Sequence, residues 1–580
     1  MNEPRPGRAA ARRFSAAWLA VALGLAVTLP GIGTGLSLDD HAHAFFVATE
    51  RTAGTHRFWE LFDVCGRRGP SDIAARIALG ALPWWALPNL SMAMFRPLAG
   101  LSHYVDYSFF PKHPVWMHLE NCAWYALLVG LVAELYRRID GARTAALGAL
   151  LFAVSEAHAE STAWIANRNT LMTAAAVAGV LIAHDSSRRD GSRTARRLAP
   201  LLLLAGYGSS EGAIAAFAYL VPYAVFLDRD SPRRRASSLV PLFAVTVAWQ
   251  LLYRLAGYGV RGSAAYRDPL TSPGAFFTER VPAVLPATVR ELLVPGRIGA
   301  MWWRGHSVIP WVTAASALGC GLLLLRLAIR DRRIAFWLSA LVLAPLPACV
   351  VEMTPRLFLV PSIAALALIA ELSLVLCRTA LAPGARLLRG GAAAFAGVLL
   401  LIHGVRPLWA APRAHETLLW MDAPFRLSAL ALPPHDPSLF DVLYVVNTPN
   451  FFITALSPLY AEPGAWPSRT YVLGSTTTPV RMIRPDATSI VLEARNGYLT
   501  DPYSRLVRAP EYPFTRGEVI RMGPLRVTVE EITPDGRPLR VRFYSKRLDQ
   551  PRALWVTWEG GWYRRVELPP VGTASDLPGA

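Results

Sequence analysis

Two adjacent carboxylates, Asp39 and Asp40, stand a few residues beyond the first apolar stretch of the chain. That stretch covers residues 14–36 and follows a basic N-terminus. If it crosses a bilayer, the pair lies at the membrane surface on the far side, where a carboxylate can act as a general base on an acceptor hydroxyl. An Asp-Asp pair alone is more typical of a helix cap in a solvated loop. The rest of the chain must decide between these two interpretations.

Further ionisable residues are expected at the same side of the membrane. Charge at a membrane edge is costly and usually has a functional or a pairing reason. Each of these residues taken singly could be structural, but their convergence on one side favours a site. The set comprises Arg96, His103 and Asp106; Glu156, His158, Glu160 and Arg168; Glu211; and Glu352 with Arg356.

Metal and nucleotide sites have little support in the sequence. Glu156, His158 and Glu160 have a spacing that permits a metal ion, but the signal is weak. We predict no metal site, with a divalent cation as the alternative. The five cysteines show no metal spacing, so neither a disulfide framework nor a structural zinc site is expected. There is also no nucleotide-binding motif in a context that would support it.

Composition indicates a polytopic membrane protein. Of the 580 residues, 53% are hydrophobic, and they come in blocks of nearly bilayer-spanning length. The net charge is +18, and almost all of the basic residues are arginines, since Lys112 and Lys546 are the only lysines. The arginine clusters lie between apolar blocks, as the positive-inside rule predicts for loops. The basic excess therefore does not indicate a nucleic-acid partner.

The apolar blocks predict about eleven spans, with the N-terminus in the cytoplasm and the C-terminus outside. The first block is expected to be a retained anchor, because many spans follow and no clear signal-peptidase site appears. Two long loops, 39–114 and 254–305, are placed on the outer side, and the amphipathic segment 73–87 is expected as one or two helices on the membrane surface. The predicted spans are 14–36, 115–136, 144–157, 170–183, 198–208, 213–227, 239–252, 308–327, 334–351, 357–376 and 390–409.

After residue 412 the pattern changes to that of a β domain. Residues 440–447 and 469–473 are typical of strands, and alternating apolar residues follow at 525–529 and 539–543. Pro534-Asp535-Gly536 and Gly560-Gly561 indicate turns. We predict a transmembrane domain over 1–411 and an extracytoplasmic antiparallel β domain over 412–580.

The order of these motifs resembles the GT-C class of membrane glycosyltransferases. The likeness is nearest to the bacterial relatives of the transmembrane-and-TPR O-mannosyltransferases, and it covers roughly the first 375 residues. No TPR array is present, since the β domain stands in its place. The motifs are Asp39-Asp40, Phe95-Arg96-Pro97-Leu98, Ser102-His103, Asp106-Tyr107, His118 with Asn121, His158-Ala159-Glu160, Trp164 to Arg168, Ser210-Glu211, and Pro355-Arg356 to Pro361-Ser362.

This resemblance implies an enzyme that takes a sugar from a polyprenyl-phosphate carrier, with an acidic residue of the first outer loop as base. It points to Asp39 or Asp40, with a marginal preference for Asp40, and to Arg168 and Arg356 as ligands of the lipid phosphate. The other residues expected to bind substrate are Arg96, His103, Asp106, His158, Glu160 and Glu211. The chain departs from the family pattern at Ser155-Glu156, Ser210 and Asn169, so the acceptor does not carry over.

The leading hypothesis is a hexosyltransferase of the bacterial inner membrane, acting on its outer face with a lipid-linked sugar donor. The acceptor would be a hydroxyl of a protein, a lipid or a glycan, as in protein glycosylation or cell-envelope synthesis. One alternative is a non-catalytic relative that binds a glycan or an assembly partner. Another is a transporter of lipid-linked saccharides, for which we would expect ionisable groups at mid-membrane depth and internal repeats.

Overall fold

The computed structural model describes residues 6–295, 309–351, 354–433, 439–462, 464–546 and 548–580. The chain divides into two compact units. The first contains residues 1–62, 95–255 and 272–419, and the second contains 63–94, 256–271 and 420–580. Each unit is therefore assembled from segments that are far apart in the sequence.

The first unit is a bundle of long apolar helices. Within the described residues, eight helices are long and apolar enough to cross a membrane. The chain is thus a multi-pass membrane protein with a mainly helical fold. The main helices of the bundle, most of which form these eight segments, are α1 (Pro6–Thr28), α5 (Pro114–Ile139), α8 (Arg168–Arg189), α9 (Arg193–Ser209), α11 (Pro232–Leu255), α15 (Ile309–Ala328), α16 (Arg332–Leu343), α17 (Leu359–Leu381), α18 (Arg386–Leu400) and α20 (Ala414–Leu430), the last of which continues into the second unit.

Shorter elements complete the bundle. Two of them, α6 (Ala142–Val154) and the segment Glu211–Leu227, are apolar but too short to span a bilayer in the ordinary way. The number of spans therefore stays a prediction, although each predicted block from 115 onward coincides with helical structure in the described residues. The remaining helices are α10 (Phe217–Pro222), α12 (Pro273–Ala275), α13 (Val281–Leu293) and α19 (Arg406–Ala410).

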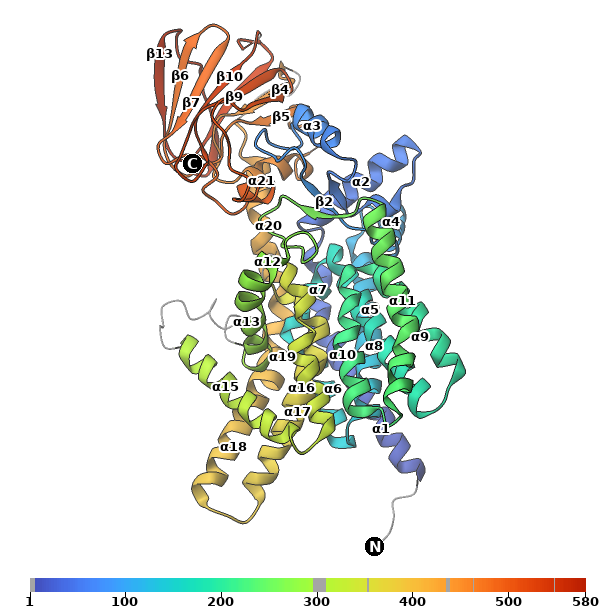
Figure 1. Cartoon of the computed structure of the whole chain (residues 1–580). Coiled ribbons are helices and arrows are strands. Elements are labelled where there is room, and N and C mark those ends of the chain that lie inside the picture. Colours follow the sequence, from blue (N-terminus) through green and yellow to red (C-terminus); the bar gives the residue numbers. More distant parts are fainter. Residues whose placement is uncertain (1–5, 296–308, 352–353, 434–438, 463, 547) are drawn as a thin grey trace. The chain divides into compact units, whose positions relative to one another are not determined.

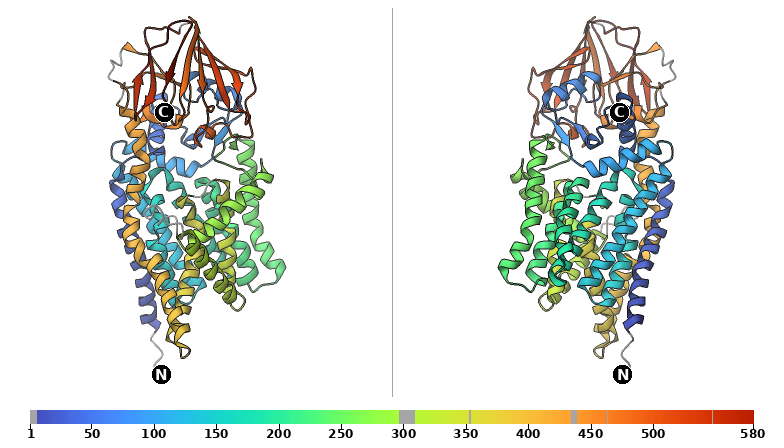
Figure 2. Two further views of the ribbon diagram at one scale, coloured as in Figure 1. Left: turned by 90° about the vertical axis from the view of Figure 1, so that its left-hand side faces the viewer. Right: turned by 90° about the vertical axis from the view of Figure 1, so that its right-hand side faces the viewer.

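The long helices run alongside one another, and α8 and α17 lie among their neighbours (Figures 1 and 2). Most side chains of these two helices are buried, whereas few of those of α11 and α15 are. Two tyrosines tie neighbouring helices to backbone carbonyls of α17: the Tyr136 hydroxyl donates to Ile363 O and the Tyr219 hydroxyl to Val360 O, both at 2.6 Å. Such bonds satisfy polar groups where no water is at hand.

One end of the bundle carries short helices in place of long loops. They are α2 (Asp39–Ala53), α4 (Pro97–Phe109) and α7 (Ala159–Ala163), and Figure 1 shows α2 and α4 at the end opposite the N-terminus. Four short 3₁₀ helices lie at the corresponding ends of the long helices that they adjoin: η3 (Glu156–His158), η4 (Ile165–Asn167), η5 (Glu211–Ala216) and η9 (Pro355–Phe358). Most of the predicted site residues stand on these elements.

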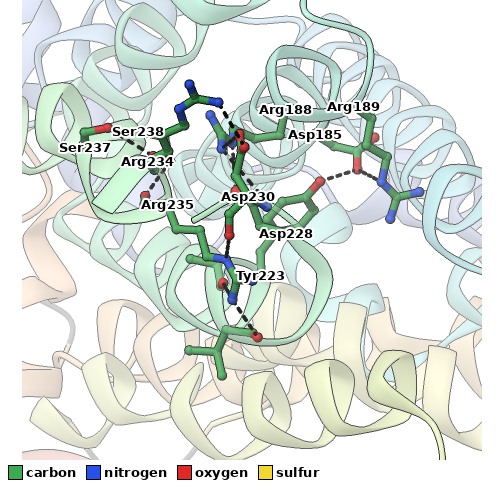
Figure 3. A network of polar contacts seen from close by, with 12 residues as sticks. Asp185, Arg188, Arg189, Tyr223, Asp228, Asp230, Arg234, Arg235, Ser237 and Ser238 are labelled. Atoms are coloured by element: carbon green, nitrogen blue, oxygen red, sulfur yellow. Dashed lines mark hydrogen bonds and ion pairs between the residues drawn. The ribbon is translucent and has the colours of Figure 1, made fainter. Parts of the chain in front are cut away.

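The opposite end is held by a network of aspartates and arginines (Figure 3). Asp185, on the last turns of α8, is almost completely buried. Its carboxylate accepts hydrogen bonds from Arg138 at 2.9 Å and from Tyr223 at 2.8 Å, and it pairs with Arg189 at 2.8 Å. Arg188 joins Asp228 in the same network at 2.7 Å. The network therefore links the ends of α5 and α8 to the segment before α11.

The second unit is built around two β-sheets. Its six-stranded sheet has the order β13-β6-β7-β10-β9-β8, with all neighbours antiparallel. The predicted turn at Pro534–Gly536 joins β9 to β10, which confirms that hairpin. The strands are β6 (Val480–Asp486), β7 (Ser489–Ala494), β8 (Val519–Met522), β9 (Leu525–Ile532), β10 (Pro538–Tyr544) and β13 (Thr573–Leu577).

The four-stranded sheet is mixed rather than purely antiparallel. It has the order β12-β11-β4-β5, in which β4 pairs in parallel with both β11 and β5. The short helix α21 (Phe451–Leu456) supplies the crossover between β4 and β5, which parallel pairing requires. The strands are β4 (Val442–Val445), β5 (Arg469–Val472), β11 (Ala553–Glu559) and β12 (Trp562–Arg565), with Gly560-Gly561 turning between the last two as predicted.

Residues 73–87, expected on the membrane surface, belong instead to the core of the second unit, as part of its segment 63–94. Helix α3 (Pro70–Leu79) buries Ile73 and Ile77 in one apolar cluster with the strands. Trp84 and Trp85 are also completely buried there, and the Trp84 indole donates to Leu473 O at 2.9 Å. The amphipathic pattern was correct, but the apolar face covers protein rather than lipid. A small sheet of β1 (Asp63–Cys65), β2 (Ser91–Ala93) and β3 (Gly259–Arg261) joins the two loop segments.

We predict that Asp185→Asn lowers the free energy of unfolding by about 1–3 kcal/mol, because a buried carboxylate with three polar partners loses its charge. Asp190→Asn is the control, since Asp190 is 55% exposed and meets Arg138 at only the edge of the network. Thermal unfolding of both variants in the same detergent measures the difference. Equal midpoints for the two variants would contradict a stabilising role for the buried network.

Candidate functional site

Asp39 and Asp40 open helix α2, and the structure gives them different surroundings. Asp39 is exposed to solvent, whereas Asp40 has no exposed surface. Protein nevertheless surrounds Asp39 on several sides, and this burial raises the pKa of its carboxyl while the charge of Arg356 opposes the shift. Asp39 is therefore an accessible carboxylate with more than usual basicity.

The carboxylate of Asp40 is engaged in hydrogen bonds with the backbone. Its two carboxylate oxygens accept hydrogen bonds from Ser37 N at 2.9 Å and from Ala166 N at 2.7 Å. Burial raises the pKa of this carboxyl well above its usual value, and the two N–H donors act in the opposite direction. Asp40 thus joins the start of α2 to the turn before α8, and its oxygens are not directed at a ligand.

The backbone just before the pair is strained. Leu38 has φ 52° and ψ −120°, a conformation that non-glycine residues rarely adopt. Strain of this kind costs about 1–3 kcal/mol and persists only where the surroundings enforce it. Here the Ser37–Asp40 hydrogen bond closes the turn, and Leu38 packs against the cluster that contains Trp164.

Arg168, at the start of α8, is a completely buried cation. All three guanidinium nitrogens have partners: Nε donates to Asn121, Nη2 donates to Met117 O, and Nη1 pairs with Asp106 at 2.6 Å and with Glu120 at 2.7 Å. It thereby ties α8 to α4 and α5. A phosphate would reach this side chain only by displacing one of these partners.

Arg356 differs from Arg168 in that its donors are not engaged within the described chain. Its guanidinium lies over the ring of Trp164, 5.3 Å from the centroid, and the side chain is half-buried. No hydrogen bond or ion pair joins it to another described residue. Its charge lowers the pKa of both Asp39 and Glu160, two carboxyls whose pKa burial raises. Asp39, Glu160 and Arg356 therefore form one accessible group of charges.

A buried polar cluster lies behind this group. His103 on α4 faces His43 on α2, with ring centroids 5.3 Å apart, and Tyr107 lies beside His103. Neither nitrogen of His103 has a hydrogen-bond partner among the described residues. Burial lowers the pKa of His43 to about 3 and that of His103 well below its usual value, with the nearby Arg96 and Arg168 charges adding to the effect. Both imidazoles are therefore neutral.

Two further predicted residues pair with each other. Arg96, at the start of α4, donates from Nε and Nη2 to Glu211 on η5, at 3.0 and 2.9 Å. The guanidinium also lies over the ring of Phe62. This arrangement ties α4 to the turn before α10.

His158 is buried between helices. Its Nδ1 meets the Tyr125 hydroxyl at 3.1 Å and its Nε2 meets Ser362 Oγ at 2.8 Å, which leaves neither nitrogen for a metal ion. Glu156 is ion-paired with Arg406. No group of three or more metal-binding side chains occurs among the described residues. Glu352 lies outside the part of the chain that the structure describes, as do residues 296–305 of the second predicted outer loop.

The predicted residues thus separate into three kinds. Asp39, Glu160 and Arg356 are accessible; Arg96–Glu211 and His158 connect helices; the others are buried, namely Asp40, His103, Asp106 and Arg168. Sequence reasoning did not assign roles to Trp164, Glu120 or His43. The interval of four residues between Asp39 and His43 could have indicated that the two share a helix face.

Comparison with known proteins gives similarity to solved structures only. No protein-family model matches the chain, and no curated protein matches it significantly. The apo oligosaccharyltransferase of Archaeoglobus fulgidus is similar, with 11% identity and a TM-score of 0.45, over 80% of this chain and 64% of that one. The same archaeal enzyme, AglB, in complex with an inhibitory peptide and a dolichol-phosphate gives 13% identity and a TM-score of 0.44, over 78% and 65%.

A bacterial structure is similar as well. ArnT from Cupriavidus metallidurans bound to undecaprenyl phosphate has 15% identity and a TM-score of 0.36, over 90% of this chain and 97% of that one. Both proteins are GT-C glycosyltransferases, the class that the sequence motifs resemble. The chain spans 64% of the length of the archaeal oligosaccharyltransferase. At these TM-scores the similarity does not decide the reaction, which depends on the chain's own residues.

The two aspartates should respond differently to the same substitution. Asp40→Asn should lower the free energy of unfolding by about 1–3 kcal/mol, because an amide nitrogen would then face one of two backbone N–H donors. Asp39→Asn should leave stability nearly unchanged, because Asp39 is exposed and its carboxylate accepts no backbone N–H from a described residue, unlike that of Asp40. Thermal unfolding of both variants at pH 7 tests this contrast, and a larger loss in Asp39→Asn would overturn it.

Proposed function

We propose that this chain is a membrane glycosyltransferase that moves a sugar from a polyprenyl-phosphate carrier to an acceptor hydroxyl. The observation that carries the proposal is an accessible, basic aspartate, Asp39, beside an arginine, Arg356, whose donors no described residue engages. General-base catalysis needs the first group and phosphate binding the second. The motif resemblance supports the same reaction class.

The proposed chemistry is a single displacement. The acceptor O–H donates its proton to the Asp39 carboxylate as the acceptor oxygen attacks the anomeric carbon. The bond from that carbon to the phosphate oxygen breaks, and the polyprenyl phosphate leaves with the electron pair. Arg356 then stabilises the negative charge on the leaving phosphate through parallel N–H bonds.

The surroundings favour Asp39 over Asp40 as base. A base must come within hydrogen-bond reach of the proton that it takes. Asp39 is exposed, whereas Asp40 is buried and holds two backbone N–H groups. We therefore assign Asp40, which the sequence marginally preferred, the role of positioning Asp39. Glu160, which shares the influence of Arg356, is assigned to the acceptor or sugar hydroxyls.

Arg168 and Arg356 were both expected to hold the phosphate, and the proposal separates them. Arg168 is a positioning residue, because its guanidinium already binds α4 and α5. Arg356 is the proposed phosphate ligand, and Trp164 holds its plane. The setting that we propose is the bacterial inner membrane, with the N-terminus in the cytoplasm and the site on the outer face. The sugar is proposed to be a hexose, and the acceptor a protein, lipid or glycan.

Turnover should depend on Asp39 and on pH. In Asp39→Asn we expect kcat to fall by about 10²- to 10⁴-fold, the usual contribution of a general base. In the wild type, kcat/KM should rise with pH through an apparent pKa above the ordinary aspartate value of about 3.9 and then level off, because only the ionised carboxyl accepts the proton. Sugar release from polyprenyl-phosphate donors by purified protein measures both effects.

The control for this experiment is Asp190→Asn, at the other end of α8. Unchanged turnover in Asp39→Asn would end its assignment as base. Absence of turnover with every donor, in a wild-type protein that is folded, would favour the glycan-binding or transport alternatives over the enzyme.

Arg356 should contribute through its planar fork. Arg356→Gln should raise KM for the lipid-linked donor and lower kcat/KM by about 10²-fold, since a hydrogen bond to a charged group contributes about 1.5–3 kcal/mol. Arg356→Lys keeps the charge but loses the paired N–H geometry, so it should restore only part of the loss. Full activity in Arg356→Gln would show that the phosphate is held elsewhere.

A further inference from the structure

We propose that the start of α9 and the start of α11 together bind the headgroups of anionic phospholipids. This surface, here named the basic collar, is independent of the proposed glycosyl transfer and lies at the end of the bundle that also holds the N-terminus. Its members are all exposed arginines: Arg193, Arg196, Arg197, Arg229, Arg233 and Arg234.

The two helices bring these arginines to one level. The Tyr207 hydroxyl donates to Thr246 Oγ1 at 3.1 Å, and the Tyr207 ring stacks on Trp249, so α9 and α11 lie side by side. Tyr207 and Thr246 each stand 14 residues after the first residue of their helix. At a rise of about 1.5 Å per residue, the two helices therefore begin at the same depth.

The charges of the collar are not neutralised within the protein. Residues 185–197 and 228–235 contain nine arginines against four aspartates. The aspartates already belong to the buried network, in which Asp185 is paired with Arg138 and Asp228 with Arg188. Arg234 reaches Asp230 at 3.5 Å, but the other five collar side chains make no hydrogen bond or ion pair with a described residue.

Helix polarity increases this positive potential. Arg193 and Arg196 lie in the first turns of α9, and Arg233 and Arg234 lie in the first turn of α11. The N-terminus of a helix carries a partial positive charge, so arginines there are unfavourable unless an anion is present. The collar therefore combines unpaired guanidinium groups with two helix ends of the same sign.

An apolar surface adjoins the collar and identifies the anion as part of an amphiphile. Leu198 and Leu201 follow on α9, at 44% and 62% exposed, and Val240 and Phe243 follow on α11, both at 61%. Such a surface in a multi-pass protein faces acyl chains. Arginines directly beyond it stand at the depth of the lipid headgroups, where each basic residue adds attraction to an anionic leaflet.

The test compares phosphatidylglycerol with phosphatidylcholine of the same acyl chains, using full-length protein in a neutral detergent. We expect native mass spectrometry to show preferential retention of phosphatidylglycerol. In Arg193→Gln/Arg196→Gln/Arg197→Gln, its affinity should fall by at least about tenfold, since each basic residue contributes about fivefold. The control is Arg495→Gln/Arg516→Gln/Arg521→Gln, which removes the same charge from exposed positions in the second unit and should leave the affinity unchanged.

Three outcomes would overturn the proposal. They are equal retention of the two lipids by the wild type, equal loss in both triple variants, and competition by millimolar inorganic phosphate without any preference for phosphatidylglycerol, which would indicate a site for free anions. A second measurement needs no variant: raising the salt from 0.05 to 0.5 M should abolish the wild-type preference, because exposed charges are screened. A preference that survives high salt would contradict a headgroup held by the collar.

Discussion

The end of the helical unit that carries α2 and α4 depends on one interaction, the buried guanidinium of Arg168. Taking an arginine out of water costs several kcal/mol unless its donors are satisfied. Here acceptors on α4 and α5 surround it, and two of them, Asp106 and Glu120, are charged. Neither helix can move away without leaving a buried charge unpaired, so α4, α5 and α8 form one rigid support.

This support explains why chemistry is assigned to side chains that lie around it and not within it. Arg168, Asp106 and Asn121 satisfy one another, and a ligand that bound them would have to break those bonds first. Asp39 and Arg356 lie near this support but make fewer polar contacts with other described residues. The pKa of Asp39 is raised because the surrounding protein keeps water away from the carboxyl and so disfavours its ionised form. A carboxyl in such a position is a better proton acceptor than one in bulk solvent.

Sequence patterns were sufficient for the long helices and for two hairpins of the second unit, β9–β10 and β11–β12. A span of about 20 apolar residues and the alternation in β9 and β10 are local signals, and local signals survive folding. The packing of residues 63–94 is not determined by a local signal. Ile73 and Ile77 form an apolar stripe that suits a membrane surface or a protein core equally well, and the choice depended on strands nearly 400 residues later. The parallel pairing of β4 with β11 could not be predicted from the sequence for the same reason, because the two strands are far apart in the chain.

Two adjacent residues of the site, Asp39 and Asp40, show the same difference between what local sequence predicts and what depends on distant contacts. Sequence predicted that Asp39 and Asp40 follow the first apolar helix but could not assign their roles. Consecutive residues on a helix point about 100° apart, and the rotation of α2 is unknown from the chain. The structure sets that rotation through one contact, in which Ala166 N donates to Asp40. Once Asp40 faces the bundle, Asp39 must face solvent, and the strained backbone at Leu38 is the local cost of that orientation. The exposure of the proposed base therefore follows from the burial of its neighbour.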